Sequence, residues 1–336
     1  MAQNRTAFLD GAAQRLRVDD TPVGQPGPDE VLIKNHALAI NPVDYKVQDS
    51  GFFVRNWPFV LGCDVAGEVE AVGSNVTAFK PGDRVIGHAV GLIHQEHKYG
   101  GFNKYTVVPA AITAKVPSSI AYTDAATLPL AIETAAVGLY RTEPGFLGLP
   151  YPSLSPKDLG KTILVWGGAS SVGIQAIQLA VASGARVITT ASPRNFELVK
   201  RAGASEVFDY NSASVVSDVV TAVKKQGTFG GVYDAIALAP SFEKEFEVIQ
   251  KLGGGPVAAS MTLPKTLPEG IIGGEIAAFH EATHPVWKDY ITAALEAGKL
   301  LCLPPADIVG QGLESVQHAV DLMKKGVNGK KLVVEV

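Results

Sequence analysis

Cysteine is scarce in this chain. Only Cys63 and Cys302 occur among its 336 residues. Two thiols cannot build a disulfide framework or a four-thiolate zinc site, so neither kind of support is expected in the fold. We therefore expect both side chains to be reduced thiols.

Clusters of positive charge are also missing. Charged residues make up 18% of the chain, the net charge is −4, and no cluster of five or more Lys or Arg occurs. Binding to nucleic acid needs a basic patch that neutralises phosphates, so this composition argues against it. A small-molecule ligand is expected instead.

Long apolar runs are absent as well. Gly, Pro or a charged residue interrupts each apolar stretch well before the roughly 18 residues that a membrane span requires. The segment Met1–Asp10 lacks the apolar centre and the cleavage site of a secretory signal. The sequence thus predicts a cytoplasmic protein that does not enter a membrane.

The apolar residues that are present, 46% of the chain, suffice for large cores. Because the chain is longer than the roughly 250 to 300 residues at which a single core usually splits, two domains are expected. Residues 30–117 alternate short apolar runs with turns, which indicates strands. From Thr162 onward strands alternate with helical stretches, which predicts an α/β fold with a parallel, doubly wound sheet. The final apolar strand, Lys331–Val334, is expected to rejoin the first domain.

A glycine-rich turn, Trp166–Gly173, joins an apolar strand to an apolar helix. In that setting the backbone can approach a pyrophosphate, and the N–H groups at the start of the helix attract its charge. The turn departs from the G-x-G-x-x-G pattern at Ser170, whose hydroxyl could bind phosphate. An ordinary strand-to-helix turn is the alternative. The residues of the turn that we predict to bind a dinucleotide are Gly168, Ser170, Ser171, Val172 and Gly173.

The end of the next strand indicates which dinucleotide is bound. An Asp or Glu there would hold the ribose 2′-hydroxyl of NAD, but the stretch Thr189–Asn195 contains no acid. Its hydrogen-bond donors and its cation suit a 2′-phosphate, so NADPH is preferred over NADH. Arg194 is otherwise a solvated surface cation. The residues predicted to contact this part of the cofactor are Ser192, Pro193, Arg194 and Asn195.

Further motifs occur at Asn41–Asp44, Leu61–Val69 and Pro81–Val85. With the glycine turn they resemble the medium-chain dehydrogenase/reductase superfamily, and the resemblance covers nearly the whole chain. It is strongest to the zinc-free quinone oxidoreductase and enoyl reductase branch. Within that branch three segments resemble fungal trans-acting enoyl reductases, which act with polyketide synthases: Asn41–Lys46, Trp166–Gly173 and Ser192–Phe196.

The resemblance implies a fold and further cofactor contacts. A GroES-like, β-rich catalytic domain would comprise residues 1–125, completed by residues 278–336, and a Rossmann domain would comprise residues 126–277. Tyr210, otherwise an aromatic at a strand end, would lie near the 2′-phosphate. The residues of the catalytic domain implied to contact the cofactor are Asn41, Val43, Asp44, Lys46, Val327 and Asn328.

The resemblance also bears on zinc. Zinc-dependent alcohol dehydrogenases of the superfamily carry a Gly-His-Glu segment, a catalytic Cys near the position of Asp44, and a lobe of four cysteines. This chain has Gly62–Asp64 in place of that segment, and it has no cysteine lobe. Both zinc ions are therefore expected to be absent, with Cys63 a small buried side chain. His94 and His97 have a metal-binding spacing but are expected to bind none.

Without a Lewis acid, dehydrogenation of an alcohol loses its means of polarising oxygen. Reduction of an activated carbon–carbon double bond remains feasible, because it needs only hydride delivery to the β-carbon and a donor for the enolate oxygen. Lys46 is the candidate donor, although it could instead pair with cofactor ribose hydroxyls or be a surface lysine. Tyr45 is a second candidate, and Asp44 is expected to orient its neighbours.

Two apolar, loop-like segments, residues 143–156 and 271–279, suit a pocket for a long hydrophobic acyl chain. Packing between domains or subunits is the alternative. The residues predicted to contact substrate are Ile272, Gly273, Gly274, Ile276 and Phe279.

The sequence thus predicts an NADPH-dependent, zinc-free enoyl reductase. Its expected substrate is a hydrophobic, polyketide-type enoyl thioester on the carrier domain of a polyketide synthase, and it would act as a monomer or homodimer. A stand-alone quinone or enal reductase is the alternative. A redox-silent NADPH-binding scaffold or sensor is a second alternative, which would bind NADPH without transferring hydride.

Overall fold

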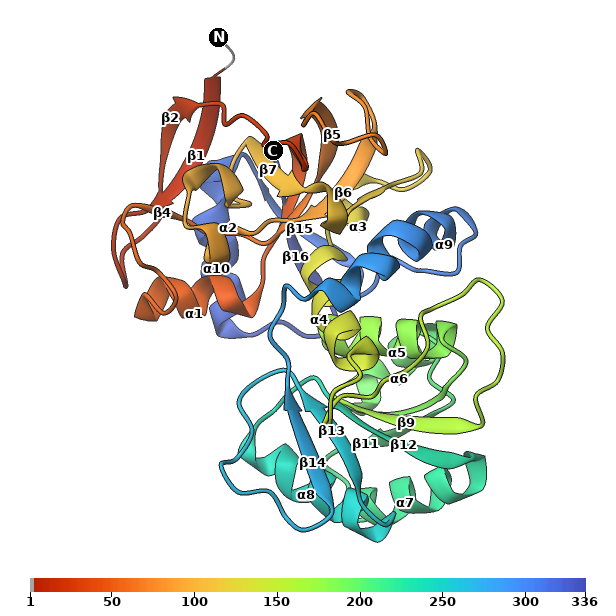
Figure 1. Cartoon of the computed structure of the whole chain (residues 1–336). Coiled ribbons are helices and arrows are strands. Elements are labelled where there is room, and N and C mark those ends of the chain that lie inside the picture. Colours follow the sequence, from red (N-terminus) through yellow and green to blue (C-terminus); the bar gives the residue numbers. More distant parts are fainter. Residues whose placement is uncertain (1–2) are drawn as a thin grey trace. The chain divides into compact units, whose positions relative to one another are not determined.

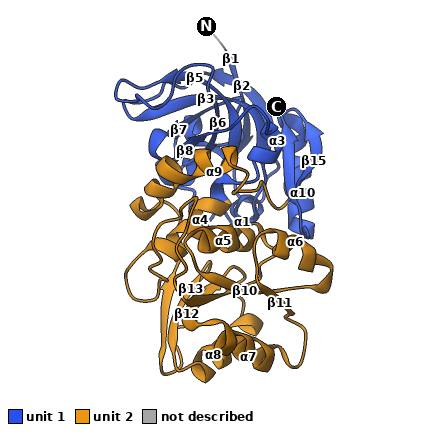
Figure 2. Ribbon diagram, turned by 90° about the vertical axis from the view of Figure 1, so that its right-hand side faces the viewer, with its two compact units in different colours: residues 1–130, 305–336 blue, residues 131–304 orange. Residues whose placement is uncertain are grey.

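The computed structural model describes residues 3–336. These residues form two compact units, coloured separately in Figure 2. One unit lies within Met1–Leu130 and Pro305–Val336, and the other lies within Ala131–Pro304. Helices and strands occur in both, as Figure 1 shows, so the predicted two-domain α/β fold is confirmed.

The first unit is rich in strands. A seven-stranded sheet has the order β15-β16-β3-β5-β6-β8 with β7 on β3, and a three-stranded sheet has the order β2-β1-β4. The strands are β1 (Gln3–Leu9), β2 (Arg17–Pro22), β3 (Glu30–Ala39), β4 (Phe59–Val60), β5 (Asp64–Val72), β6 (Arg84–His88), β7 (Tyr105–Pro109), β8 (Thr113–Lys115), β15 (Ala306–Gln311) and β16 (Lys331–Glu335). The α-helices are α1 (Pro42–Ser50), α2 (Gly91–His94), α3 (Tyr122–Ala125) and α10 (Val316–Lys325).

Three chain segments converge at the end of β3. Both β16 and β5 are antiparallel to β3, with Val333 opposite Ala39 in one pair and Asp64 opposite Ala39 in the other. The starts of β16 and β5 therefore lie on either side of the point where β3 ends and α1 begins. The pairing of β16 also confirms that the final strand rejoins the first domain.

The second unit contains a six-stranded parallel sheet with the order β11-β10-β9-β12-β13-β14, which is the doubly wound order of a Rossmann fold. Its strands are β9 (Lys161–Trp166), β10 (Arg186–Ala191), β11 (Glu206–Asp209), β12 (Thr228–Asp234), β13 (Gly255–Ala259) and β14 (Ile271–Glu275). Its α-helices are α4 (Pro129–Tyr140), α5 (Ser171–Ala182), α6 (Phe196–Arg201), α7 (Val215–Gln226), α8 (Ala239–Lys251) and α9 (Thr292–Glu296), and a π-helix spans Val286–Ile291.

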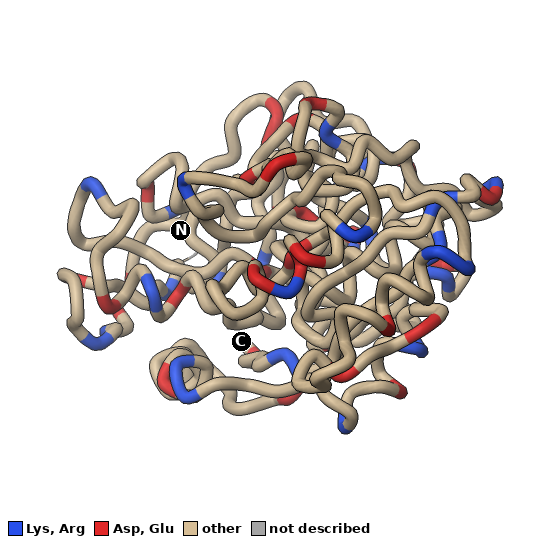
Figure 3. Tube along the Cα trace, turned by 90° about the horizontal axis from the view of Figure 1, so that it is seen from below, with Lys and Arg blue, Asp and Glu red and all other residues tan. Residues whose placement is uncertain are grey.

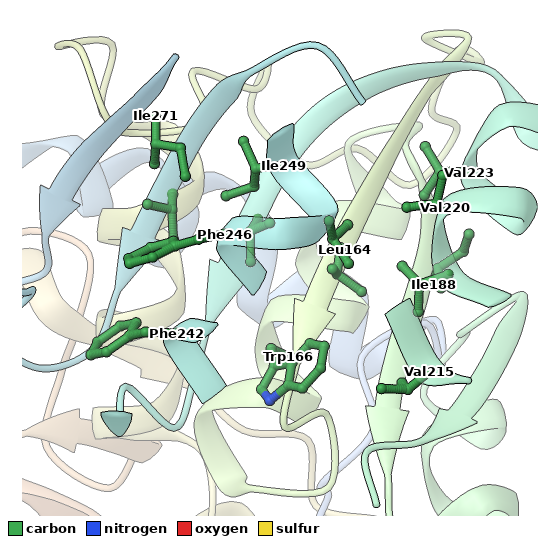
Figure 4. Close-up of a cluster of buried hydrophobic side chains, with 14 of the residues drawn as sticks. Leu164, Trp166, Ile188, Val215, Val220, Val223, Phe242, Phe246, Ile249 and Ile271 are labelled. Carbon is green, nitrogen blue, oxygen red and sulfur yellow. The ribbon is translucent and has the colours of Figure 1, made fainter. Parts of the chain in front are cut away.

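A core cluster packs α7 and α8 onto one face of this sheet (Figure 4). Leu164 and Ile188 point into it from β9 and β10, and Phe242 and Phe246 project from α8. The strand β9 is buried from Thr162 to Trp166, as expected for a central strand covered on both faces. This packing fixes the carboxyl ends of the strands, where the glycine turn lies.

The segment 271–279 is only partly a loop, so the expectation of a loop there was wrong for its first five residues. Ile271–Glu275 form the edge strand β14, parallel to β13. The glycines hid this strand from sequence reasoning, because Gly is depleted in strands. Here they serve a close approach: a Cβ at Gly274 would lie 2.8 Å from the backbone carbon of Gly145.

The two units divide after residues 130 and 304, whereas the sequence placed the boundaries after residues 125 and 277. Residues 278–304 are joined to the rest of the Rossmann unit by side-chain hydrogen bonds. Glu133 of α4 accepts hydrogen bonds from Thr283 and Trp287, and Gln178 of α5 bonds to the backbone of Leu301.

Lys and Arg are interspersed with Asp and Glu along the chain trace (Figure 3). Within residues 3–336, the helices are all too short or too polar to cross a membrane.

Candidate functional site

The turn between β9 and α5 has the backbone of a phosphate-binding loop. Gly167 adopts a φ of +79°, a value that favours glycine. A Cβ at Gly173 would lie 2.9 Å from the Cα of Gly168 and would collide with the carbonyl oxygen of Gly167. Glycine is therefore required at the point where the helix meets the strand.

Ser170 caps α5. Its Oγ accepts a hydrogen bond from the N–H of Gly173 at 3.0 Å and donates one to the carbonyl of Gly167 at 2.9 Å. The N–H groups of Ser171 and Val172, in the first turn, have no acceptor within the helix and lie at the positive end of its dipole. The turn thus fits a dinucleotide pyrophosphate, while the hydroxyl of Ser170 holds the turn in shape.

The neighbouring strands bring the predicted 2′-phosphate residues to one edge of the sheet. Ala191 of β10 lies opposite Asp209 of β11, so Ser192 and Tyr210 follow at adjacent strand ends. The amide of Asn195, which is buried, donates to the Ser192 Oγ at 3.2 Å.

Two other charged groups lie at this edge. The carboxylate of Asp209 accepts from the backbone N–H of Asn211 at 2.9 Å and from its side chain at 3.2 Å. Lys244 of α8 donates from Nζ to the carbonyl of Tyr210 at 2.6 Å. Sequence reasoning missed Lys244, because 34 residues separate it from Tyr210 and no motif links them.

A buried pair of acids shapes the loop after β12. One oxygen of Asp234 accepts from the N–H groups of Ile236 and Ala237, both at 2.8 Å. Glu245 of α8 is fully buried near Asp234, and neither of its carboxyl oxygens has a hydrogen-bond partner among the described residues. Burial raises the pKa of Glu245 well above its ordinary value, and the negative charge of Asp234 raises it further. The raised pKa favours the neutral form of the Glu245 carboxyl.

In the first unit, a buried ion pair occupies the place where β16, β3 and β5 converge. Lys331 Nζ lies 2.8 Å from Asp64 Oδ2, and the two side chains are 2% and 0% exposed. Asn41 bridges them, because its amide donates to Asp64 at 2.7 Å and its carbonyl oxygen accepts from Lys331. The other Asp64 oxygen accepts from the backbone N–H of Leu130 at 2.6 Å.

The carboxylate of Asp44 holds the start of α1. It accepts from the backbone N–H of Asn41 at 2.7 Å and from that of Gly62 at 3.1 Å. Burial raises the pKa of Asp44 to about 7, and the charge of Asp64 adds to this effect. Asn41 and Asp44, both predicted from the sequence, thus belong to one buried network, and Asp44 orients its neighbours.

The other predicted residues of this unit are more exposed. Lys46 is exposed on α1, while Tyr45 and Val43 are half-buried on the same helix. Val327 is half-buried and Asn328 is exposed in the loop that precedes β16.

The residues at the superfamily's zinc position do not fit a zinc ion. Cys63 is buried, and burial raises the pKa of its thiol well above the usual value. The carboxylate of Asp64 is paired with Lys331. Among the described residues, no group of three His, Cys, Asp or Glu side chains could hold a metal.

His94 and His97 each contact another residue. The ring of His94 lies 4.6 Å from that of Tyr99, and His97 Nε2 lies 2.8 Å from the carbonyl oxygen of Pro58.

The predicted substrate segment is held by Glu133. The carboxylate of Glu133 accepts from Trp287 Nε1 at 2.6 Å and from the Thr283 hydroxyl at 2.9 Å, and the backbone of Phe279 also donates to it. Phe279 adopts a φ of +74°, which is unusual for a bulky residue. Backbone strain of this kind is frequent at ligand sites. Sequence reasoning missed Glu133, whose partners lie about 150 residues away.

The other predicted substrate residues differ in accessibility. Ile272 is 51% exposed on β14, and Ile276 is half-buried after the strand. Gly274 is buried against the backbone of Gly145. Gly273 packs against Leu263, because a Cβ added at Gly273 would lie 2.5 Å from Leu263 Cδ1.

Comparison with known proteins agrees with this architecture. Residues 27–118 match the family model of the alcohol dehydrogenase GroES-like domain, and residues 171–277 match that of the zinc-binding dehydrogenases. Two domains of these kinds define an oxidoreductase that uses a nicotinamide cofactor. The chain belongs to the medium-chain dehydrogenase/reductase superfamily.

Individual relatives extend the match over the whole chain. Dehydrogenase orsE of Emericella nidulans is 46% identical and covers 100% of both chains. Trans-enoyl reductase himH of Aspergillus japonicus is 41% identical over 91% of this chain and 90% of its own. The structure of mycobacterial Rv1454c in complex with NADPH is similar with a TM-score of 0.72 at 26% identity, covering 99% of this chain and 100% of that one.

Proposed function

We propose that this oxidoreductase uses NADPH to reduce an activated carbon–carbon double bond, without zinc, in a polyketide-type enoyl thioester presented in trans. The observation that carries the proposal is the Lys331–Asp64 ion pair at the superfamily's zinc position. A buried ammonium beside Asp64 disfavours a divalent cation there, and the alcohol chemistry that needs such a cation is then disfavoured.

The preference for NADPH is supported by the end of β10. Residues 189–195 contain no acid to bind a ribose 2′-hydroxyl. Ser192 and Arg194 offer a hydroxyl and a guanidinium suited to a phosphate, and within residues 3–336 Arg194 forms no ion pair that would compete.

The chain's own residues divide the work of the reaction. When bound, NADPH supplies the hydride that reaches the β-carbon of the substrate. The turn at Gly168–Gly173 and the residues Ser192–Asn195 hold its phosphates. The ammonium of Lys46 donates to the substrate carbonyl oxygen, where negative charge develops as the enolate forms. The α-carbon then takes a proton from water or from a side chain.

The substrate class is supported by relatives and by the second unit. Trans-enoyl reductases of Aspergillus japonicus and Aspergillus flavipes are 41% and 34% identical to the chain. Ile272, Ile276 and Phe279 provide apolar contacts on and after β14, which suits a hydrophobic acyl chain. The carrier domain of a polyketide synthase is the proposed partner.

Stopped-flow loss of NADPH absorbance tests the proposal directly. We expect the full chain to oxidise NADPH with a short enoyl thioester, and Lys46→Met to slow that step by about 100-fold. The matched control is Lys80→Met, an exposed lysine in a turn of the same unit, which should keep the rate. Turnover of small quinones but of no α,β-unsaturated thioester would contradict the proposal.

That contrary result would favour a stand-alone quinone reductase, a function named for a mycobacterial structure with a TM-score of 0.72 and 26% identity. Tight NADPH binding, unchanged by Lys46→Ala, with no hydride transfer to any acceptor would favour a redox-silent scaffold or sensor.

A further inference from the structure

Lys244 lies at the edge of the sheet where the adenosine end of the cofactor is proposed to bind. Its Nζ donates to the carbonyl of Tyr210 at 2.6 Å. Tyr210 follows β11 and is 40% exposed, and the β10–β11 register puts Ser192 at the adjacent strand end. Lys244 therefore belongs to the same strand-end neighbourhood as the predicted 2′-phosphate residues, although it comes from α8.

The charge of Lys244 is not neutralised by a carboxylate. Among residues 3–336, Lys244 takes part in no ion pair, whereas Glu247 on the same helix pairs with Lys251 at 3.2 Å. Asp209, the residue before Tyr210, accepts two hydrogen bonds from Asn211 at one carboxylate oxygen, and among the described residues it forms no ion pair with Lys244. A cation that no carboxylate pairs with, beside exposed hydrogen-bonding groups, is suited to an anion.

The geometry of the contact leaves donors available. An ammonium carries three N–H donors, and the carbonyl of Tyr210 takes one. That bond holds the head group of a flexible side chain in place, so less conformational entropy is lost when an anion binds.

We propose that Lys244 is a specificity residue for the dinucleotide: it binds the 2′-phosphate that distinguishes NADPH from NADH, as a second cation besides Arg194. The inference rests on the proposed use of NADPH. It adds a residue from α8 to the predicted 2′-phosphate residues at the ends of β10 and β11.

The test compares two fragments of the cofactor that differ only in this phosphate. Adenosine 2′,5′-bisphosphate and 5′-AMP are titrated calorimetrically into the full chain. For Lys244→Met we expect about tenfold weaker binding of the bisphosphate, because one charge-assisted hydrogen bond is lost, and no change for 5′-AMP. Lys244→Arg should keep the preference for the bisphosphate.

The matched control is Lys251→Met, at the end of the same helix, whose ion pair with Glu247 is exposed. It should bind both fragments as the unchanged chain does. Raising the salt concentration should reduce the preference for the bisphosphate in the unchanged chain more than in Lys244→Met.

Two results would overturn the inference, and they can be told apart. If the unchanged chain prefers the bisphosphate and Lys244→Met keeps that preference in full, or loses affinity for both fragments equally, the role of Lys244 is wrong while NADPH use stands. If the unchanged chain binds both fragments equally, and NADPH no better than NADH, the proposed cofactor preference fails as well.

Discussion

At the scale of single residues, the most consequential side chain is one that sequence reasoning did not single out. Lys331 is buried against Asp64 and Asn41, each contributed by a different part of the chain. The glycines of the turn could be predicted, because strand, turn and helix are contiguous in sequence. Lys331 could not, because 267 residues separate it from Asp64 and only the pairing of both β16 and β5 with β3 brings them together.

Replacing Lys331 tests this pair. Lys331→Met should lower the free energy of unfolding by about 3 to 5 kcal/mol, because it leaves a buried carboxylate without its cation. Urea unfolding measures the change, and Lys331→Met combined with Asp64→Asn should recover at least half of it. The control is Lys324→Met, whose ion pair with Asp49 is exposed and should contribute less than about 1 kcal/mol. Equal losses for Lys331→Met and Lys324→Met would show that the buried pair has no special role.

The raised pKa of the buried Glu245 makes stability depend on pH. Its pKa is raised in the folded chain above its ordinary value of 4.5, so above that pH the unfolded chain releases a proton that the folded chain keeps. This group's contribution is fully present below the unfolded pKa, and it falls as the pH rises toward the folded pKa. Glu245→Gln keeps nearly the same side-chain shape and removes the ionisation.

We expect Glu245→Gln to raise the melting temperature at pH 7 to 8 and to leave it unchanged near pH 4. The control is Glu247→Gln, an exposed glutamate on the same helix, which should show no such trend. A stabilisation by Glu245→Gln that is the same at both pH values would contradict the raised pKa of Glu245.

At the scale of elements, the junction of β9 and α5 is set by backbone contact. Gly173→Ala places a methyl group against the carbonyl oxygen of Gly167, which is backbone and cannot rotate away. We expect a lower melting temperature and NADPH binding at least about tenfold weaker by fluorescence titration. Unchanged affinity for NADPH would show that the junction tolerates a side chain and that binding of the pyrophosphate does not depend on the close backbone approach at Gly173.

The element that the sequence hid is β14. Ile271–Glu275 contain two adjacent glycines, which in isolation indicate a loop, yet the segment pairs with β13 along its length. The approach of Gly145 to Gly274 explains the glycines, and that contact is tertiary. Local propensity could not reveal it.

At the scale of the whole molecule, the class of fold was predictable. The alternation of strands and helices from Thr162 onward predicts a doubly wound sheet, and the sheet order confirms it. The unit to which residues 278–304 belong was harder to predict from the sequence. Those residues follow the Rossmann strands in sequence, and their association with α4 and α5 depends on Glu133 and Gln178, side chains that carry no motif.

Transfer of deuterium tests the central claim, reduction of a carbon–carbon double bond by NADPH, most directly. The full chain is incubated with NADPH that carries deuterium at the transferable position, together with a short enoyl thioester, and the product is analysed by mass spectrometry and NMR. The account predicts a saturated thioester with one deuterium, located on the β-carbon. Recovery of the unreduced thioester, while the same preparation binds NADPH, would contradict it.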